Sequence, residues 1–116
     1  MSDLKTITTQ ISEALSSSID PLNTAQVTFK INRLTLMLAA SCHAVAWAER
    51  IYTRRMQQLT EDKTWTNLSA TDKKAIFAGY CRDEAYYLTL TERQNKAIIH
   101  ALEALKAMMW NAEGSS

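Results

Sequence analysis

The stretch WAERIYTRRM, residues 47–56, sets aromatic and arginine side chains close together on one expected helix. Arginine, tryptophan and tyrosine are typical anchors of protein interfaces, and stacking aromatics beside arginines also hold single-stranded nucleic acid. The stretch is either a solvated helix end, whose long side chains cover the edge of the core, or a contact surface. Our hypothesis is that the stretch is a contact surface. The predicted partner-binding patch consists of Trp47, Arg50, Tyr52, Arg54 and Arg55.

A second stretch, GYCRDEAYYL, combines tyrosines, a thiol and three charges. If two long helices fold back around residues 60–68, His43 lies opposite the adjacent tyrosines of this stretch, with Glu84 in reach. A His–Glu–Tyr cluster can transfer protons, but we favour a buried polar layer that fixes the register of the helices. The predicted layer comprises His43, Glu84, Tyr87, Thr91 and Asn95.

Metal and redox chemistry have weaker support in the sequence. The same fold-back brings together four possible zinc ligands, Cys42, His43, Cys81 and Glu84. The Glu-x-x-His pairs of di-iron bundles are absent, and HALE at residues 100–103 has the reverse order. The two cysteines lack CxxC spacing, so we expect free thiols in a reducing cytoplasm. No metal or cofactor is predicted.

Enzymatic catalysis is not expected. The chain has no glycine-framed serine and no glycine-rich phosphate loop. Its two glycines leave few places where the backbone can closely approach a substrate. We therefore look for a binding function.

The composition predicts an all-α fold in a single domain over residues 1–116. That length suits one domain, and 47% apolar residues suffice for a core. Two glycines and one proline are too few for the many tight turns of a β-rich domain. We expect a long antiparallel helical hairpin, residues 24–59 and 70–112, plus a short N-terminal helix at 3–19.

Local signals set the expected boundaries. The first helix should end before Asp20 and Pro21, because the residue before a proline is disfavoured in the α region. SATD, residues 69–72, is a capping box that starts the next long segment. We favour one bent helix over 70–112, with the bend near Gly79 or near residue 90. The alternative is two helices that meet near residue 90, where TERQ forms a second cap-like pattern. Residues 113–116 are expected to be a disordered tail.

The long helix at 24–59 has apolar seams on two sides. The main seam follows heptad spacing, and Arg55 fills a polar position between Tyr52 and Leu59. A neighbouring seam holds Met37, Ala40, Ala44, Trp47 and Ile51. One hairpin partner covers only one side, so we expect a homodimer or higher oligomer. The most apolar run, residues 34–48, falls short of the roughly 20 residues that span a bilayer, and no membrane association is expected.

The net charge of +1 argues against a basic nucleic-acid-binding arm, an acidic tail or strong long-range electrostatic steering of a partner. The first ten residues lack the pattern of a secretory signal, which favours a cytoplasmic protein. The leading hypothesis is a non-catalytic module that binds an unidentified protein as adaptor, assembly factor or inhibitor. Size and composition suit a small bacterial or phage accessory protein. The alternatives are a single-stranded nucleic-acid-binding or recombination accessory protein and, more weakly, a metal-binding or redox helical bundle.

Overall fold

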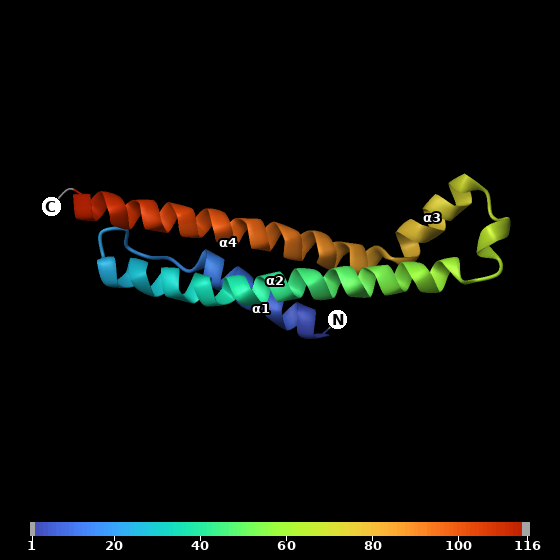
Figure 1. The fold of residues 1–116 in the computed structure, drawn as a ribbon, viewed down its shortest axis with the longest axis horizontal. Helices are drawn as coiled ribbons and strands as arrows, with labels where there is room; N and C mark the ends of the chain where they lie inside the picture. The colour runs from blue at the N-terminus through green and yellow to red at the C-terminus, as the bar shows by residue number, and fades with distance from the viewer. Residues whose placement is uncertain (1, 115–116) are drawn as a thin grey trace.

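The computed structural model describes residues 2–114 as an elongated all-α bundle of 70 × 24 × 18 Å. The predicted fold class is confirmed, because two long helices pack side by side in opposite directions and a short N-terminal helix lies along them (Figure 1). The elements are α1 (Ser2–Ser16), α2 (Thr24–Thr60), a 3-10 turn η1 (Trp65–Asn67), α3 (Ala70–Tyr80) and α4 (Arg82–Gly114).

Caps and turns explain where the helices begin. The side chain of Asn23 accepts a hydrogen bond from the backbone N–H of Gln26 and starts α2. The hydroxyl of Ser69 accepts one from the N–H of Asp72 and starts α3, as the capping-box pattern predicts. The first helix ends at Ser16, three residues before its predicted end.

The predicted segment over 70–112 changes direction close to Gly79, one of the two expected positions (Figure 1). The change at Cys81 divides the segment into two helices, so the preference for a continuous helix is wrong. α3 leaves the axis of α4 at a sharp angle (Figure 1). The break lies two residues after Gly79, and glycine weakens a helix interior. Arg55 stabilises the break by donating a hydrogen bond to the carbonyl of Tyr80. α4 continues through residue 90 and on to Gly114. The first half of the tail expected at 113–116 is therefore helical, and residues 115–116 lie outside the described part.

The core lies between α1, α2 and α4 and forms two clusters. The larger contains seven buried side chains: Ile11, Ala14, Val27, Leu34, Ile98, Leu102 and Leu105. The smaller holds Leu4, Ala44 and Ala48, with Trp47, Ile51, Tyr87 and Leu88 packed against it. α1 thus covers the second apolar seam of α2 over half of its length. Within residues 2–114, no helix combines the length and apolar character needed to cross a membrane.

The register of the hairpin differs from the predicted one by about two helical turns. The side chain of Asn95 contacts Ser41 and Cys42, and Thr28 contacts Met109. The prediction placed His43 opposite the tyrosines near residue 87. The observed register differs from this prediction because α3 extends away from α2. The chain therefore begins its return along α2 only at residue 82 (Figure 1).

Candidate partner-binding surface

The predicted buried polar layer forms only in part. Thr91 is buried, and its hydroxyl donates to the carbonyl of Leu88. Asn95 donates from Nδ2 to the hydroxyl of Ser41 at 3.2 Å. His43 is exposed and lies edge-on to Trp47, with ring centroids 6.5 Å apart. Its placement in a buried layer was wrong, because the register shift moves it away from the other members.

The remaining two members of that layer have other neighbours. The half-buried Tyr87 makes an edge contact with Tyr86, at 5.3 Å between ring centroids. Glu84 pairs with Arg55. The five predicted residues therefore spread along α2 and α4 instead of forming one layer.

Gln94 makes the buried polar contact that the sequence analysis missed. Its Nε2 donates to the carbonyl of Thr8 at 2.8 Å and to the hydroxyl of Ser12 at 2.9 Å, which joins α4 to α1. Its Oε1 is buried without a hydrogen-bond partner among the described residues. The available signal was spacing, because Gln94 continues the helical steps from Thr91 to Ile98, whereas we interpreted TERQ as a cap.

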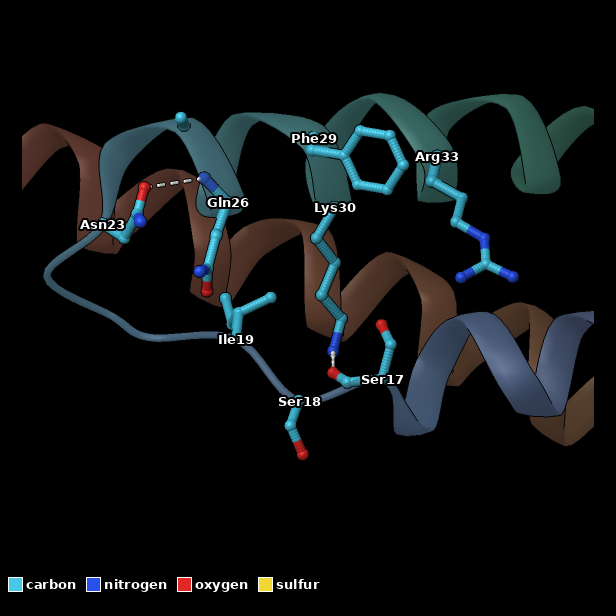
Figure 2. A pocket seen from close by; sticks show the side chains of 9 residues that line it. Ser17, Ser18, Ile19, Asn23, Gln26, Phe29, Lys30 and Arg33 are labelled. Carbon is cyan, nitrogen blue, oxygen red and sulfur yellow. Dashed lines mark hydrogen bonds between the residues drawn. The ribbon is translucent and has the colours of Figure 1, made fainter.

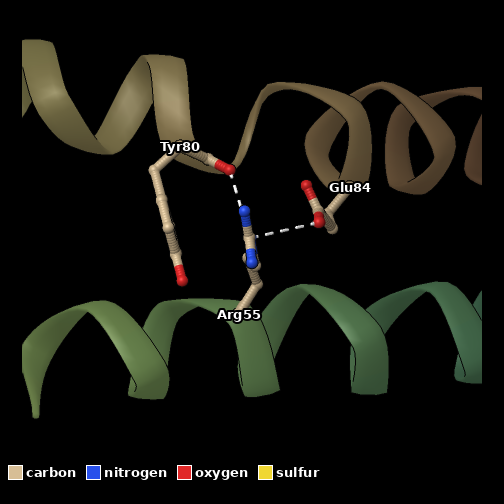
Figure 3. A network of polar contacts seen from close by, with 3 residues as sticks. All are labelled: Arg55, Tyr80 and Glu84. Carbon is tan, nitrogen blue, oxygen red and sulfur yellow. Dashed lines mark hydrogen bonds and ion pairs between the residues drawn. The ribbon is translucent and has the colours of Figure 1, made fainter.

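Arg55 lies between α2 and the α3–α4 junction (Figure 3). Its Nε is 3.3 Å from the carbonyl oxygen of Tyr80 and 3.4 Å from Oε1 of Glu84, and its guanidinium lies 3.7 Å from the centre of the Tyr80 ring. Nearby, Tyr52 makes an edge contact with Phe77 of α3 at 6.1 Å. Tyr52 and Arg55 thus anchor α3, and we remove them from the predicted partner-binding patch.

Cys81 is buried at the same junction. Burial raises the pKa of its thiol, and the nearby Glu84 carboxylate raises it further, while the Arg55 guanidinium acts in the opposite direction. The neutral thiol is therefore the favoured form of Cys81. Cys42, by contrast, is exposed on α2.

We expect iodoacetamide to alkylate Cys42 well before Cys81, because the thiolate is the nucleophile and Cys81 is both buried and protonated. Peptide mass mapping over time measures the two rates, and both cysteines should react alike in urea. Equal rates in the native protein would contradict the placement of Cys81.

The structure does not bring the four possible zinc ligands together. Cys81 and Glu84 lie at the α3–α4 junction, while Cys42 contacts Asn95 farther along the bundle. In the described part of the chain, no three His, Cys, Asp or Glu side chains are grouped so that they could hold a metal ion.

The other members of the patch lie on one side of α2, which we call the outer face of α2. It consists of two rows of residues spaced by seven, which share one side of a helix. Phe29 and Leu36, in the first row, are 70% and 75% exposed. The first row contains the exposed residues Phe29, Leu36, His43 and Arg50. The second row contains the half-buried Arg33, Ala40 and Trp47 and the exposed Arg54, and Trp47 also packs against the smaller core cluster.

Two open hollows lie at the C-terminal half of this face. His43, Ala46, Trp47 and Arg50 line one of 290 Å³. Arg50 and Arg54 line the other, of 440 Å³, together with Glu49. Long side chains therefore surround shallow depressions here, a form suited to receiving side chains of another molecule.

The outer face is also basic. α2 contains five basic residues and one acidic residue, Glu49. Lys30 and Arg55 are engaged inside the molecule. Arg33, Arg50 and Arg54 form no ion pair with any acidic side chain that the structure describes. This helix concentrates positive charge that the net value for the whole chain conceals.

No family model, curated protein or solved structure matches this chain.

Proposed function

We propose that the chain is a non-catalytic protein-binding module, acting as adaptor, assembly factor or inhibitor, and that the outer face of α2 packs against a helix of its partner. The observation that carries this proposal is the exposed heptad row Phe29, Leu36, His43 and Arg50 on α2, which lies beside a half-buried row that ends at the exposed Arg54. From Phe29 to Arg54 the pattern extends over roughly 38 Å. Heptad rows of this kind are the usual contact surface between two long helices.

The residue types favour a protein over a nucleic acid. Two large apolar side chains, Phe29 and Leu36, are mostly exposed at one end of the face. A partner helix with apolar side chains can cover them, which removes apolar area from water. Trp47 and the arginines supply the side chains that most often dominate protein interfaces.

The test is a pair of variants. We expect Arg50→Ala with Arg54→Ala to weaken partner binding at least about tenfold while helicity is kept, because these arginines anchor the contact and alanine favours helix. The control is Arg93→Ala with Lys96→Ala, two exposed cations on α4. Complexes recovered from source cells and quantified by mass spectrometry give the comparison. Equal recovery from both variants would contradict the proposal.

Single-stranded nucleic acid is the second candidate, favoured by Arg33, Arg50 and Arg54 on the outer face, which form no ion pair with a described acidic side chain. Its signature is affinity that falls steeply with salt, with a slope reduced by about one unit for each arginine–phosphate contact removed. Fluorescence anisotropy with a labelled oligonucleotide measures this slope. Strong, salt-sensitive binding that depends on Arg50 and Arg54 would replace the protein partner with nucleic acid.

We also expect the chain to form a homodimer or higher oligomer. Exposed large apolar residues occur along the bundle: Leu22, Phe29, Leu36, Ile76, Tyr86, Ile99 and Trp110. A second copy is the simplest cover for such surfaces, through a two-fold interface. Light scattering on a size-exclusion column should give at least twice the chain mass at micromolar concentration. A monomer mass would contradict this expectation.

A further inference from the structure

A pocket of 340 Å³ lies where the end of α1, the connection to α2 and the first turns of α2 meet (Figure 2). Its volume is within the usual range for small-ligand sites. Ile19 and Phe29 give it apolar walls, and none of its lining residues is acidic.

The polar groups of the pocket are mainly hydrogen-bond donors. The side-chain oxygens of Asn23 and Gln26 are already used, because Asn23 accepts from the N–H of Gln26 and Gln26 accepts from the N–H of Asp20. Their amino groups carry no hydrogen bond to the described residues and are available to a ligand. A ligand that accepts hydrogen bonds therefore suits this wall.

Two cations complete the site. The ammonium of Lys30 donates to the carbonyls of Leu15 and Ser17, at 3.1 and 2.7 Å, and is thereby held in place. Arg33 extends toward α1 beside it (Figure 2) and forms no ion pair with a described acidic side chain. A fixed charge and a free guanidinium next to an apolar wall match a ligand that is anionic at one end and apolar at the other.

We propose that this pocket binds a carboxylate adjacent to an apolar side chain, presented by a segment of the partner protein. The carboxylate pairs with Arg33, and the apolar group packs between Ile19 and Phe29. Carbonyl groups of the same segment accept hydrogen bonds from the amides of Asn23 and Gln26, which lie about two helical turns or more from Arg33. This inference rests on the proposed function, because Phe29 and Arg33 are also the first residues of the outer face of α2. The partner's contact with that face thus continues into the pocket.

The test is a titration of isotope-labelled protein, followed by NMR, with N-acetylphenylalanine and with its uncharged amide. The carboxylate form should shift the backbone amides of residues 17–33 saturably, with millimolar affinity, and the amide form should bind about fivefold to tenfold more weakly. Inorganic phosphate, which has charge without an apolar group, should give no saturable shift. Equal binding of both phenylalanine ligands, saturable binding of phosphate, or shifts spread over the whole chain would overturn the proposal.

Three variants test which residues give the preference for the carboxylate over the amide and which hold the apolar group. Arg33→Gln should remove the preference for the carboxylate, and Arg54→Gln, on the same face but outside the pocket, should preserve it. Phe29→Ala should weaken both phenylalanine ligands alike. A preference that survives Arg33→Gln would overturn the proposal. Because the titration needs no partner protein, its failure rejects the pocket alone, whereas failure of the Arg50 and Arg54 test rejects the proposed function.

Discussion

Replacing Leu34 with alanine is expected to lower the free energy of unfolding by about 2–5 kcal/mol. Leu34 is 0% exposed and lies in the larger core cluster between α1, α2 and α4. The substitution removes buried apolar atoms and leaves a cavity that the three helices close only in part. Urea denaturation followed by circular dichroism measures the change.

Leu36 offers a matched control two residues away on the same helix. It belongs to the outer face of α2 and is 75% exposed. Leu36→Ala should therefore change the free energy of unfolding of the isolated protein by no more than about 0.5 kcal/mol. Similar losses at both positions would mean that the outer face is already covered in the free protein, or that α2 is rotated relative to this structure.

Replacing Arg55 with alanine is expected to cost about 1–2 kcal/mol and to loosen α3. The change removes the donor to the Tyr80 carbonyl and the partner of Glu84, whose side chain is only 14% exposed. An unpaired, partly buried carboxylate is costly, but Arg55 itself is 39% exposed, so water replaces part of the lost interaction.

Hydrogen exchange in residues 70–80 supplies a second measurement, and it should become faster in this variant. The neighbouring Arg54 is the control, because it is exposed and forms no ion pair with the described acidic side chains. Arg54→Ala should leave both the stability and the exchange of α3 unchanged within about 0.5 kcal/mol. Equal effects of the two substitutions would contradict the anchoring role of Arg55.

The fold class was predictable because the signals that define it are local. Scarce glycine and proline, apolar residues at helical spacing and the capping box are each readable over a few residues. The predicted span 24–59 for the long helix agrees with α2, Thr24–Thr60, to within one residue. The main seam also placed Arg55 toward the rest of the hairpin, where it contacts Tyr80 and Glu84.

The register was not predictable in the same way, because it depends on where the chain leaves and rejoins the hairpin. The break at Cys81 is stabilised by Arg55, twenty-six residues earlier in the sequence. No local pattern reports such a contact. The error in register then placed His43 in the interior.

The candidate site was only half visible in the sequence. The stretch around Trp47 pointed to the side of α2 that we propose as the contact surface, but arginines adjacent in sequence, Arg54 and Arg55, lie on different sides of the helix. Phe29 and Leu36 were missed because they belong to no apolar cluster. Their seven-residue spacing to His43 and Arg50 was the available signal.

The central claim is that the outer face of α2 contacts a protein, and site-specific photo-crosslinking tests it most directly. A photoreactive residue is placed at Leu36 on the outer face and, separately, at Ala104, an exposed position on α4. Irradiation in source cells should give one discrete crosslinked protein species from position 36 and much less from position 104. A mass of twice the chain identifies a second copy, and any other discrete mass identifies a different protein. Equal crosslinking from both positions, or crosslinks to nucleic acid alone, would contradict the account.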